Sequence, residues 1–221
     1  GCNCGIMDQF ASVFGKAGSL MRLDCRSLQF KYFPFDPKGY KLVLLNSQVK
    51  HELASSAYND RRKSCENVVA AMKKHWPEVE TLRDATYDML DEVRPEVSEE
   101  DALRAKYVIG EKYRVLEVCV ALEEGDYEEV GKKMYETHYG LSKEYEVSCP
   151  EIDFLNDVAH SCGVTGSRIM GGGFGGCTIN LVSDDLYDNF IETAKKAYKE
   201  KFGKEPIVID VVIGDGSRKL C

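Results

Sequence analysis

The sequence predicts an α+β fold, and three features of the chain lead to this prediction. Long stretches between residues 60 and 160 carry apolar side chains at helical spacing. Short runs rich in β-branched residues, such as Cys177–Val182, are typical of strands. From residue 167 to 213 the order strand, glycine loop, strand, helix, strand indicates a sheet layer with helices packed on one face.

The N-terminal part of the chain is expected to be short helix and strand. A helix is predicted over residues 5–14, followed by strands over 19–24 and 28–33. The segment Phe35-Asp36-Pro37-Lys38-Gly39 has turn chemistry and is the best candidate for a domain boundary. The apolar run Leu42–Leu45, bounded by polar residues, then predicts a buried strand.

A long helical region is expected in the middle of the chain. Its first apolar stripe contains Cys65, Val69, Met72 and Trp76. Ser98 followed by Asp101 resembles a capping arrangement, and the helix that it starts is expected to end at Gly125. Asp126 can cap the next helix, and Pro150 is well placed to begin another that ends near residue 160. The apolar stripes of the two helices that begin after Ser98 and after Asp126 are interpreted as core packing.

The last quarter of the chain is predicted to form strands around one further helix. Residues 167–170 and 177–182 have the character of strands on either side of a glycine-rich loop. A helix is expected over 184–202 and a final strand over 207–213.

Net charge and apolar content exclude two classes of partner. The formal charge of −8 gives no clustered basic face for nucleic acid or for an anionic membrane. The tightest basic cluster, Arg61-Arg62-Lys63, is interpreted as a solvated helix face. No run approaches the roughly 18 apolar residues of a membrane span. No nucleic acid and no membrane are therefore expected among the partners.

The cysteines indicate a reducing compartment. Their number, nine, is odd, and most of them stand in apolar surroundings such as Val118-Cys119-Val120. The first residues also lack the basic start and apolar stretch of a secretory signal. We therefore expect reduced thiols and a cytoplasmic location.

The run Met170-Gly171-Gly172-Gly173-Phe174-Gly175-Gly176 is the most unusual segment. Five glycines in six positions cost folding entropy, which indicates that the backbone must bend sharply or approach another group closely. A dinucleotide-binding loop would be followed by a helix, whereas a strand is predicted here, and no Gly-Lys-Ser/Thr ends the run. A glycine-rich hairpin without ligand and a loop that brings bare backbone to a ligand both remain open.

The other candidate is Asp8, in the first turn of the predicted N-terminal helix. The helix dipole stabilises a carboxylate there, so on its own Asp8 is interpreted as an ordinary N-terminal helix acid.

Several runs, in the same order along the chain, resemble galactokinases, members of the GHMP small-molecule kinase superfamily. The matching runs are Cys4-Gly5-Ile6-Met7-Asp8-Gln9-Phe10, Leu23-Asp24-Cys25-Arg26-Ser27-Leu28, Asn46-Ser47, Leu53-Ala54-Ser55-Ser56-Ala57-Tyr58, Arg61-Arg62, Tyr145-Glu146-Val147-Ser148-Cys149-Pro150-Glu151 and Gly166-Ser167-Arg168-Ile169-Met170 leading into Gly171 to Cys177. The resemblance implies a GHMP kinase C-terminal domain, with a ferredoxin-like sheet and helices, over residues 40–221. It implies that residues 1–39 are the end of an incomplete N-terminal GHMP domain.

The resemblance also implies roles for particular residues. Asp8 matches the catalytic acid beside the sugar hydroxyl that receives phosphate, either as a base or as an electrostatic anchor. Gly5, Asp8, Tyr58 and Gly172 match contacts to the sugar. The loop formed by Gly171, Gly172, Gly173, Phe174, Gly175 and Gly176 matches the third superfamily motif, which borders the sugar and the phosphate-binding loop. The implied reaction moves the γ-phosphoryl group of ATP to the C1 hydroxyl of D-galactose, and the implied cofactors are ATP and Mg²⁺.

The phosphate-binding loop of the family and its N-terminal sugar-recognition arginine are not found in residues 1–221. We therefore expect an upstream segment of the same protein as a partner. We also expect the ligands of Mg²⁺ to lie outside this chain, no metal site within it, and negligible kinase activity of the chain alone. Without sheet partners, residues 1–39 are expected to expose apolar side chains such as Leu28, Phe30, Tyr32 and Phe33.

Three alternatives remain open at this point. The protein could phosphorylate N-acetylgalactosamine or another GHMP substrate. It could be a galactokinase-like sensor that binds sugar and nucleotide without turnover. It could also be an independent α+β interaction domain, although the glycine loop would then have no explanation.

Overall fold

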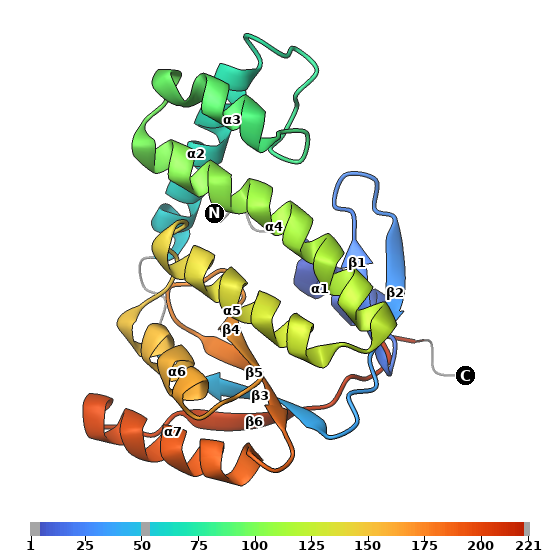
Figure 1. Cartoon of the computed structure of the whole chain (residues 1–221), viewed down its shortest axis with the longest axis vertical. Coiled ribbons are helices and arrows are strands. Elements are labelled where there is room, and N and C mark those ends of the chain that lie inside the picture. Colours follow the sequence, from blue (N-terminus) through green and yellow to red (C-terminus); the bar gives the residue numbers. More distant parts are fainter. Residues whose placement is uncertain (1–4, 50–53, 219–221) are drawn as a thin grey trace.

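The computed structural model describes residues 5–49 and 54–218, and the side chains of 54–56 are not described. Its strands form two separate antiparallel sheets (Figure 1). The smaller pairs β1 (Ser19–Leu23) with β2 (Phe30–Pro34). The larger has the order β4-β5-β3-β6 and combines β3 (Tyr40–Asn46), β4 (Gly166–Met170), β5 (Cys177–Ser183) and β6 (Ile207–Val211). The α+β prediction is confirmed.

The helices follow the expected order. Helix α1 covers Met7–Phe14 and α2 covers Ala54–Met72. The long helix α4 (Glu99–Glu124) begins after Ser98, whose hydroxyl accepts a hydrogen bond from the backbone of Asp101, and it ends at Gly125 in the left-handed conformation. The remaining α-helices are α5 (Tyr127–Lys143), α6 (Pro150–Ser161) and α7 (Tyr187–Phe202). The caps predicted at Ser98 and Asp126 are both formed.

Two features of the helical region differ from the prediction. Helix α2 ends at Met72, so Trp76 lies in a following turn, although it still packs against the apolar cluster of α2. Pro77 follows Trp76, and a residue before proline is disfavoured in the helical conformation. A further short helix, α3 (Tyr87–Val93), and the 3₁₀ turn η1 (Arg94–Glu96) also follow the turn and had not been predicted.

The larger sheet has two differently covered faces. On one face, Val43, Leu45 and Val182 pack against α6 and α7. On the other, Leu181 joins a cluster formed by β2 and α4, with Phe33 and Leu122 among its members. Beside that cluster is a partly open cavity of about 410 Å³, lined by residues of β1, α4, α5 and the sheet. The prediction of helices on one face is therefore incomplete, because α6 and α7 pack on one face and α4 contributes to the cluster on the other.

The β1–β2 hairpin is attached to the rest of the molecule by its base. Phe33 is 3% exposed, so the prediction that it would be exposed is wrong: α4 covers it in place of a sheet partner. Leu28 and Phe30 are exposed as expected, at 53% and 38%.

The position of residues 35–39, between the two sheets, is compatible with a domain boundary there. The C-terminal segment, however, returns to the N-terminal one. The backbone N–H groups of Gly216 and Ser217 donate to the carbonyls of Gly15 and Ser12, at 2.8 and 2.7 Å. The boundary at 39/40 stays a prediction. None of the described helices combines the length and apolarity needed to cross a membrane.

Candidate functional site

The glycine loop is the turn of a β-hairpin, a geometry that is compatible with both interpretations of the loop. Residues 171–176 connect β4 to β5, and Met170 pairs with Cys177 at its base. Gly173 requires glycine for two reasons. Its φ of +89° is unfavourable for other residues, and a Cβ atom there would lie 2.3 Å from the carbonyl oxygen of Val147. Gly171 and Gly172 are exposed, so this side of the loop presents bare backbone to solvent.

Two backbone contacts fix the loop against neighbouring segments. The N–H of Phe174 donates to the carbonyl of Val147 at 2.6 Å. The carbonyl of Gly176 accepts from both the backbone N–H and the hydroxyl of Ser47, at 2.9 and 2.8 Å. Ser47 is itself held by the hydroxyl of buried Tyr198, which donates to its carbonyl at 2.7 Å. The loop is therefore anchored at Phe174 and at Gly176.

Arg61 supports the segment on which the loop rests. Its Nε donates to the carbonyl of Tyr145 at 3.0 Å and its Nη2 to that of Glu146 at 2.6 Å. The same guanidinium lies 5.6 Å from the ring centroid of Phe174. The interpretation of the basic cluster as a solvated face is therefore wrong for Arg61, whereas Arg62 and Lys63 are exposed.

A second arginine, Arg104, holds the same segment through the side chain of Glu146. Glu146 has a φ of 54°, and its carboxylate accepts from Arg104, a buried residue of α4, at 2.9 Å. Arg104 also donates to the hydroxyl of Ser64 on α2 at 2.9 Å. These two supports could not be predicted from the sequence, because Arg61 contacts a carbonyl 84 residues away and Arg104 a hydroxyl 40 residues away along the chain.

The structure brings two of the predicted sugar contacts together. A Cβ atom built on Gly172 would lie 3.6 Å from Cε2 of Tyr58, so the ring stands directly beside the exposed part of the loop. Tyr58 reaches this place from the first turns of α2. A glycine at 172 leaves the space beside the ring open.

Asp8 and Gly5 are not joined to the loop by any hydrogen bond of the described residues. Asp8 lies exposed in the first turn of α1, and a Cβ on Gly5 would meet nothing within 4 Å. The helix is held to β2 by aromatic contacts among Phe10, Phe14 and Phe30, and by the Tyr32 hydroxyl, which donates to the Phe14 carbonyl at 2.5 Å. Within the same matching runs, Cys4 and Leu53 lie outside the described residues.

No group of three or more potential metal-ligating side chains occurs within residues 5–49 and 54–218. Asp153 is the best-connected carboxylate near the loop. The backbone N–H of Ile169 donates to Nδ1 of His138, so Nε2 carries the proton and faces Asp153 at 3.3 Å. The hydroxyls of Ser148 and Ser142 also donate to this carboxylate, at 2.5 and 2.8 Å. Burial alone would raise the pKa of Asp153, but these hydrogen bonds outweigh it and hold the pKa well below its usual range.

We expect Asp153→Asn to destabilise the protein at neutral pH and to flatten the acid limb of its stability curve. Because the folded pKa is lowered, the stabilisation by Asp153 is complete above the unfolded value of about 3.9 and is lost as the pH falls below it. The difference in unfolding free energy from wild type should therefore shrink between pH 6 and pH 3. Urea unfolding of both proteins across this pH range measures this difference. The control is Asp157→Asn, which changes an exposed aspartate of the same helix. A constant difference would contradict the assignment.

The family model of the GHMP kinases C terminal matches residues 119–200. The galactokinase of Clostridium beijerinckii is 42% identical over the whole chain, which covers 57% of that protein, and the galactokinase of Homo sapiens is 40% identical, with 54% covered. The chain thus spans just over half the length of these curated relatives.

The solved structures give the same result. Lactococcus lactis galactokinase complexed with galactose superposes with a TM-score of 0.93 at 30% identity, and this chain covers 57% of it. The mevalonate kinase of L. major, with a TM-score of 0.56 at 19% identity, shares the fold. Residues 119–200 therefore match the GHMP kinase C-terminal model, and the chain resembles, over its full length, the C-terminal part of galactokinases.

Proposed function

We propose that this chain is the C-terminal part of a galactokinase, which transfers the γ-phosphoryl group of ATP to the C1 hydroxyl of D-galactose. The observation that carries the proposal is the placement of Tyr58 beside the exposed backbone of Gly172, in a chain that superposes on a galactose-bound galactokinase over its whole length. The ring and the bare backbone form one side of a sugar site, and Asp8 on α1 completes it together with Gly5, which precedes that helix. The protein acts in the cytoplasm.

In this proposal the residues of the chain bind and orient the sugar. Phosphoryl transfer passes through a loose transition state, so positioning and charge account for most of the catalysis. As the bond from the C1 oxygen to phosphorus forms, the bond from phosphorus to the leaving oxygen of ADP breaks and the hydroxyl loses its proton. The Asp8 carboxylate either accepts this proton, or it stabilises the hydroxyl electrostatically while a phosphate oxygen accepts the proton. Glycine at 171 and 172, where the loop is exposed, lets the sugar and the phosphate-binding loop approach the same short segment.

The proposal divides the work between two parts of the protein. Residues 1–39 belong to the N-terminal GHMP domain and 40–221 form the C-terminal domain. The described residues provide no cluster of acids for Mg²⁺. We therefore assign the Mg²⁺ ligands and the loop that holds the phosphates of ATP to the remaining part of the protein, which the relatives' greater length accommodates.

The test is galactose-dependent release of ADP, measured for the full-length product of the gene and for residues 1–221 alone. We expect turnover at full length and a negligible rate for the chain. Turnover with N-acetylgalactosamine but not with galactose would make N-acetylgalactosamine the substrate in place of galactose. Sugar binding at full length without ADP release would replace the kinase with a sensor. Turnover by the chain alone would overturn the division of work.

A further inference from the structure

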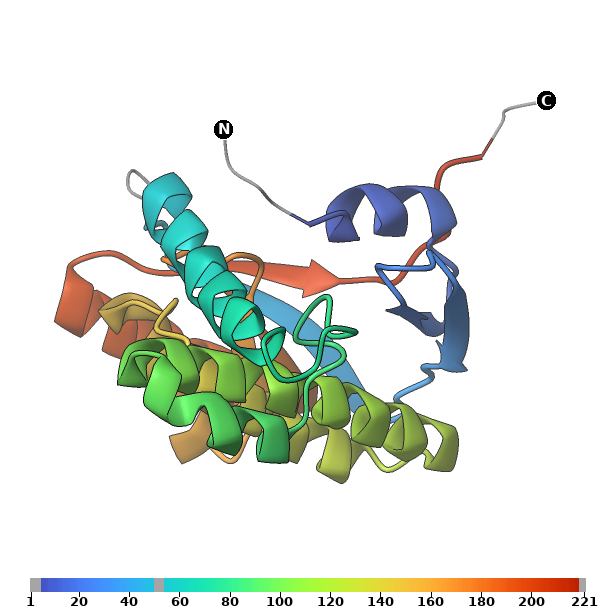
Figure 2. The same cartoon turned by 90° about the horizontal axis from the view of Figure 1, so that it is seen from above.

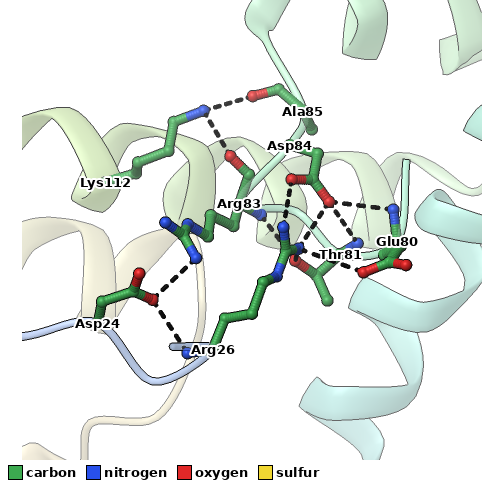
Figure 3. Close-up of polar contacts among 8 residues, drawn as sticks. All are labelled: Asp24, Arg26, Glu80, Thr81, Arg83, Asp84, Ala85 and Lys112. Atoms are coloured by element: carbon green, nitrogen blue, oxygen red, sulfur yellow. Dashed lines mark hydrogen bonds and ion pairs between the residues drawn. The ribbon is translucent and has the colours of Figure 1, made fainter. Parts of the chain in front are cut away.

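Two loops that are distant in sequence are joined by two ion pairs, and each loop provides the arginine of one pair and the aspartate of the other. One is the turn between β1 and β2, and the other is the loop between α2 and α3. Arg26 of the turn donates to both carboxylate oxygens of Asp84, at 2.9 and 2.8 Å, and Arg83 of the loop donates to Asp24 of the turn at 2.8 Å (Figure 3). We call these four residues the crossed clamp.

Both carboxylates of the crossed clamp also accept hydrogen bonds from residues of their own loops, and these hydrogen bonds fix their orientation. Asp84 also accepts from the backbone N–H groups of Glu80 and Thr81, at 3.0 and 3.1 Å. Asp24 accepts from the N–H of Arg26 at 3.0 Å and from the hydroxyl of Ser27 at 2.7 Å. An isolated surface ion pair contributes little, but a bidentate pair within a fixed network is the exception. The guanidinium of Arg26 accordingly holds the pKa of Asp84 well below its usual range.

The loop side of the crossed clamp is attached to the two long helices. Nζ of Lys112, on α4, donates to the carbonyls of Arg83 and Ala85 at 3.3 and 2.5 Å (Figure 3). The loop follows directly on α2, the helix that carries Tyr58. The loop therefore moves with the elements that hold Tyr58 beside the glycine loop.

The turn side is attached to α1. The rings of Phe10 and Phe14 each lie 5.3 Å from that of Phe30 at the start of β2, which directly follows the turn. Next to Phe30, Lys31 forms an exposed ion pair with Glu123 of α4. Towards the other end of β2, Phe33 is buried against α4. The hairpin is thus fixed at its base by apolar packing and at its tip by the crossed clamp. The turn at the tip lies beside the loop between α2 and α3 (Figures 1 and 2).

We propose that the crossed clamp sets the position of Asp8 relative to Tyr58, and that Arg26 and Arg83 are positioning residues for the sugar site. The proposal rests on the proposed function for the roles of Asp8 and Tyr58. Without the crossed clamp the hairpin keeps its base but its tip is released, and α1 moves with it. Because the turn and the loop each carry one arginine and one aspartate of the crossed clamp, only one register places opposite charges together.

The kinetic test uses the full-length protein. Arg26→Met and Arg83→Met are expected to lower kcat/KM for galactose about tenfold each, while KM for ATP stays within twofold, since small displacements of reacting groups have large kinetic effects. Arg26→Lys retains the charge but not the fork of two donors, and it should recover part of the loss. Asp84→Asn keeps an oxygen for the backbone N–H groups but loses the ion pair with Arg26. The decrease in kcat/KM of the double variant should therefore be no larger than that of Arg26→Met alone. The control is Arg94→Met, which removes an equally exposed arginine paired with nearby Glu99.

A second measurement does not require activity. In residues 1–221, hydrogen exchange of α1 should accelerate in Arg26→Met, while exchange in β3 to β5 should not change. Faster exchange confined to residues 24–29 and 73–86, with α1 unchanged, would overturn the proposal, as would additive losses in the double variant. If the full-length wild type shows no galactose turnover, the proposed function fails, and exchange in α1 still decides whether the crossed clamp positions that helix.

Discussion

Replacing Asp8 by Asn is expected to lower kcat for galactose phosphorylation by the full-length protein by about 10²–10⁴-fold, the usual contribution of a positioned acid or base. Asparagine has the same size and still accepts a hydrogen bond, but it lacks the negative charge and cannot accept the proton of the sugar hydroxyl. Because α1 buries none of its residues, the substitution should leave the unfolding temperature almost unchanged. The measurement is the steady-state rate of ADP release at saturating galactose and ATP.

The matched control is Asp188→Asn, which changes an exposed aspartate in the first turn of α7. It removes the same charge from an equivalent helix position far along the chain, and it should leave kcat unchanged. A loss below tenfold in Asp8→Asn would exclude both roles proposed for Asp8. A solvent deuterium isotope effect on kcat of the wild type would separate them, because only a base moves the proton in the transition state.

The parts of the fold that were predicted correctly depend on local signals. Strand, turn and cap residues such as Ser98, Gly125 and Asp126 act within a few positions of themselves, and the structure confirms these caps. The glycine loop was also recognisable, since the close approach of a backbone leaves a run of glycines in the sequence. Local chemistry was therefore sufficient for the order of the elements apart from α3 and η1, and for recognising the glycine loop.

The contacts that hold the site together could not be predicted, because they join distant positions. Arg61 contacts carbonyls 84 and 85 residues further along, and Arg26 reaches a carboxylate 58 residues away. An arginine on a helix has the same local pattern whether it faces water or a carbonyl. The burial of Phe33 was missed for the same reason, since helix α4, which covers it, begins 66 positions later at Glu99.

Replacing Gly173 by Ala is expected to lower the free energy of unfolding by roughly 3 kcal/mol, because backbone strain and a steric clash add up. The left-handed conformation costs a residue with Cβ about 1–2 kcal/mol. The new methyl group would also meet the Val147 carbonyl, which is part of the backbone and cannot move aside as a side chain would. The loop should shift away from Val147 and lose the hydrogen bond between that carbonyl and Phe174. Urea unfolding of residues 1–221 measures this loss.

Gly171→Ala separates the two contributions. Gly171 has nearly the same φ, +84° against +89° for Gly173, but a Cβ atom at 171 would meet nothing within 4 Å. Its cost should therefore be the conformational part alone, about 1–2 kcal/mol. In the full-length protein, KM for galactose should rise in Gly173→Ala far more than in Gly171→Ala, because only the first variant displaces the backbone that stands beside Tyr58. Equal losses in the two variants would mean that Val147 does not fix the loop, and that Ser47 and Arg61 hold it without this contact.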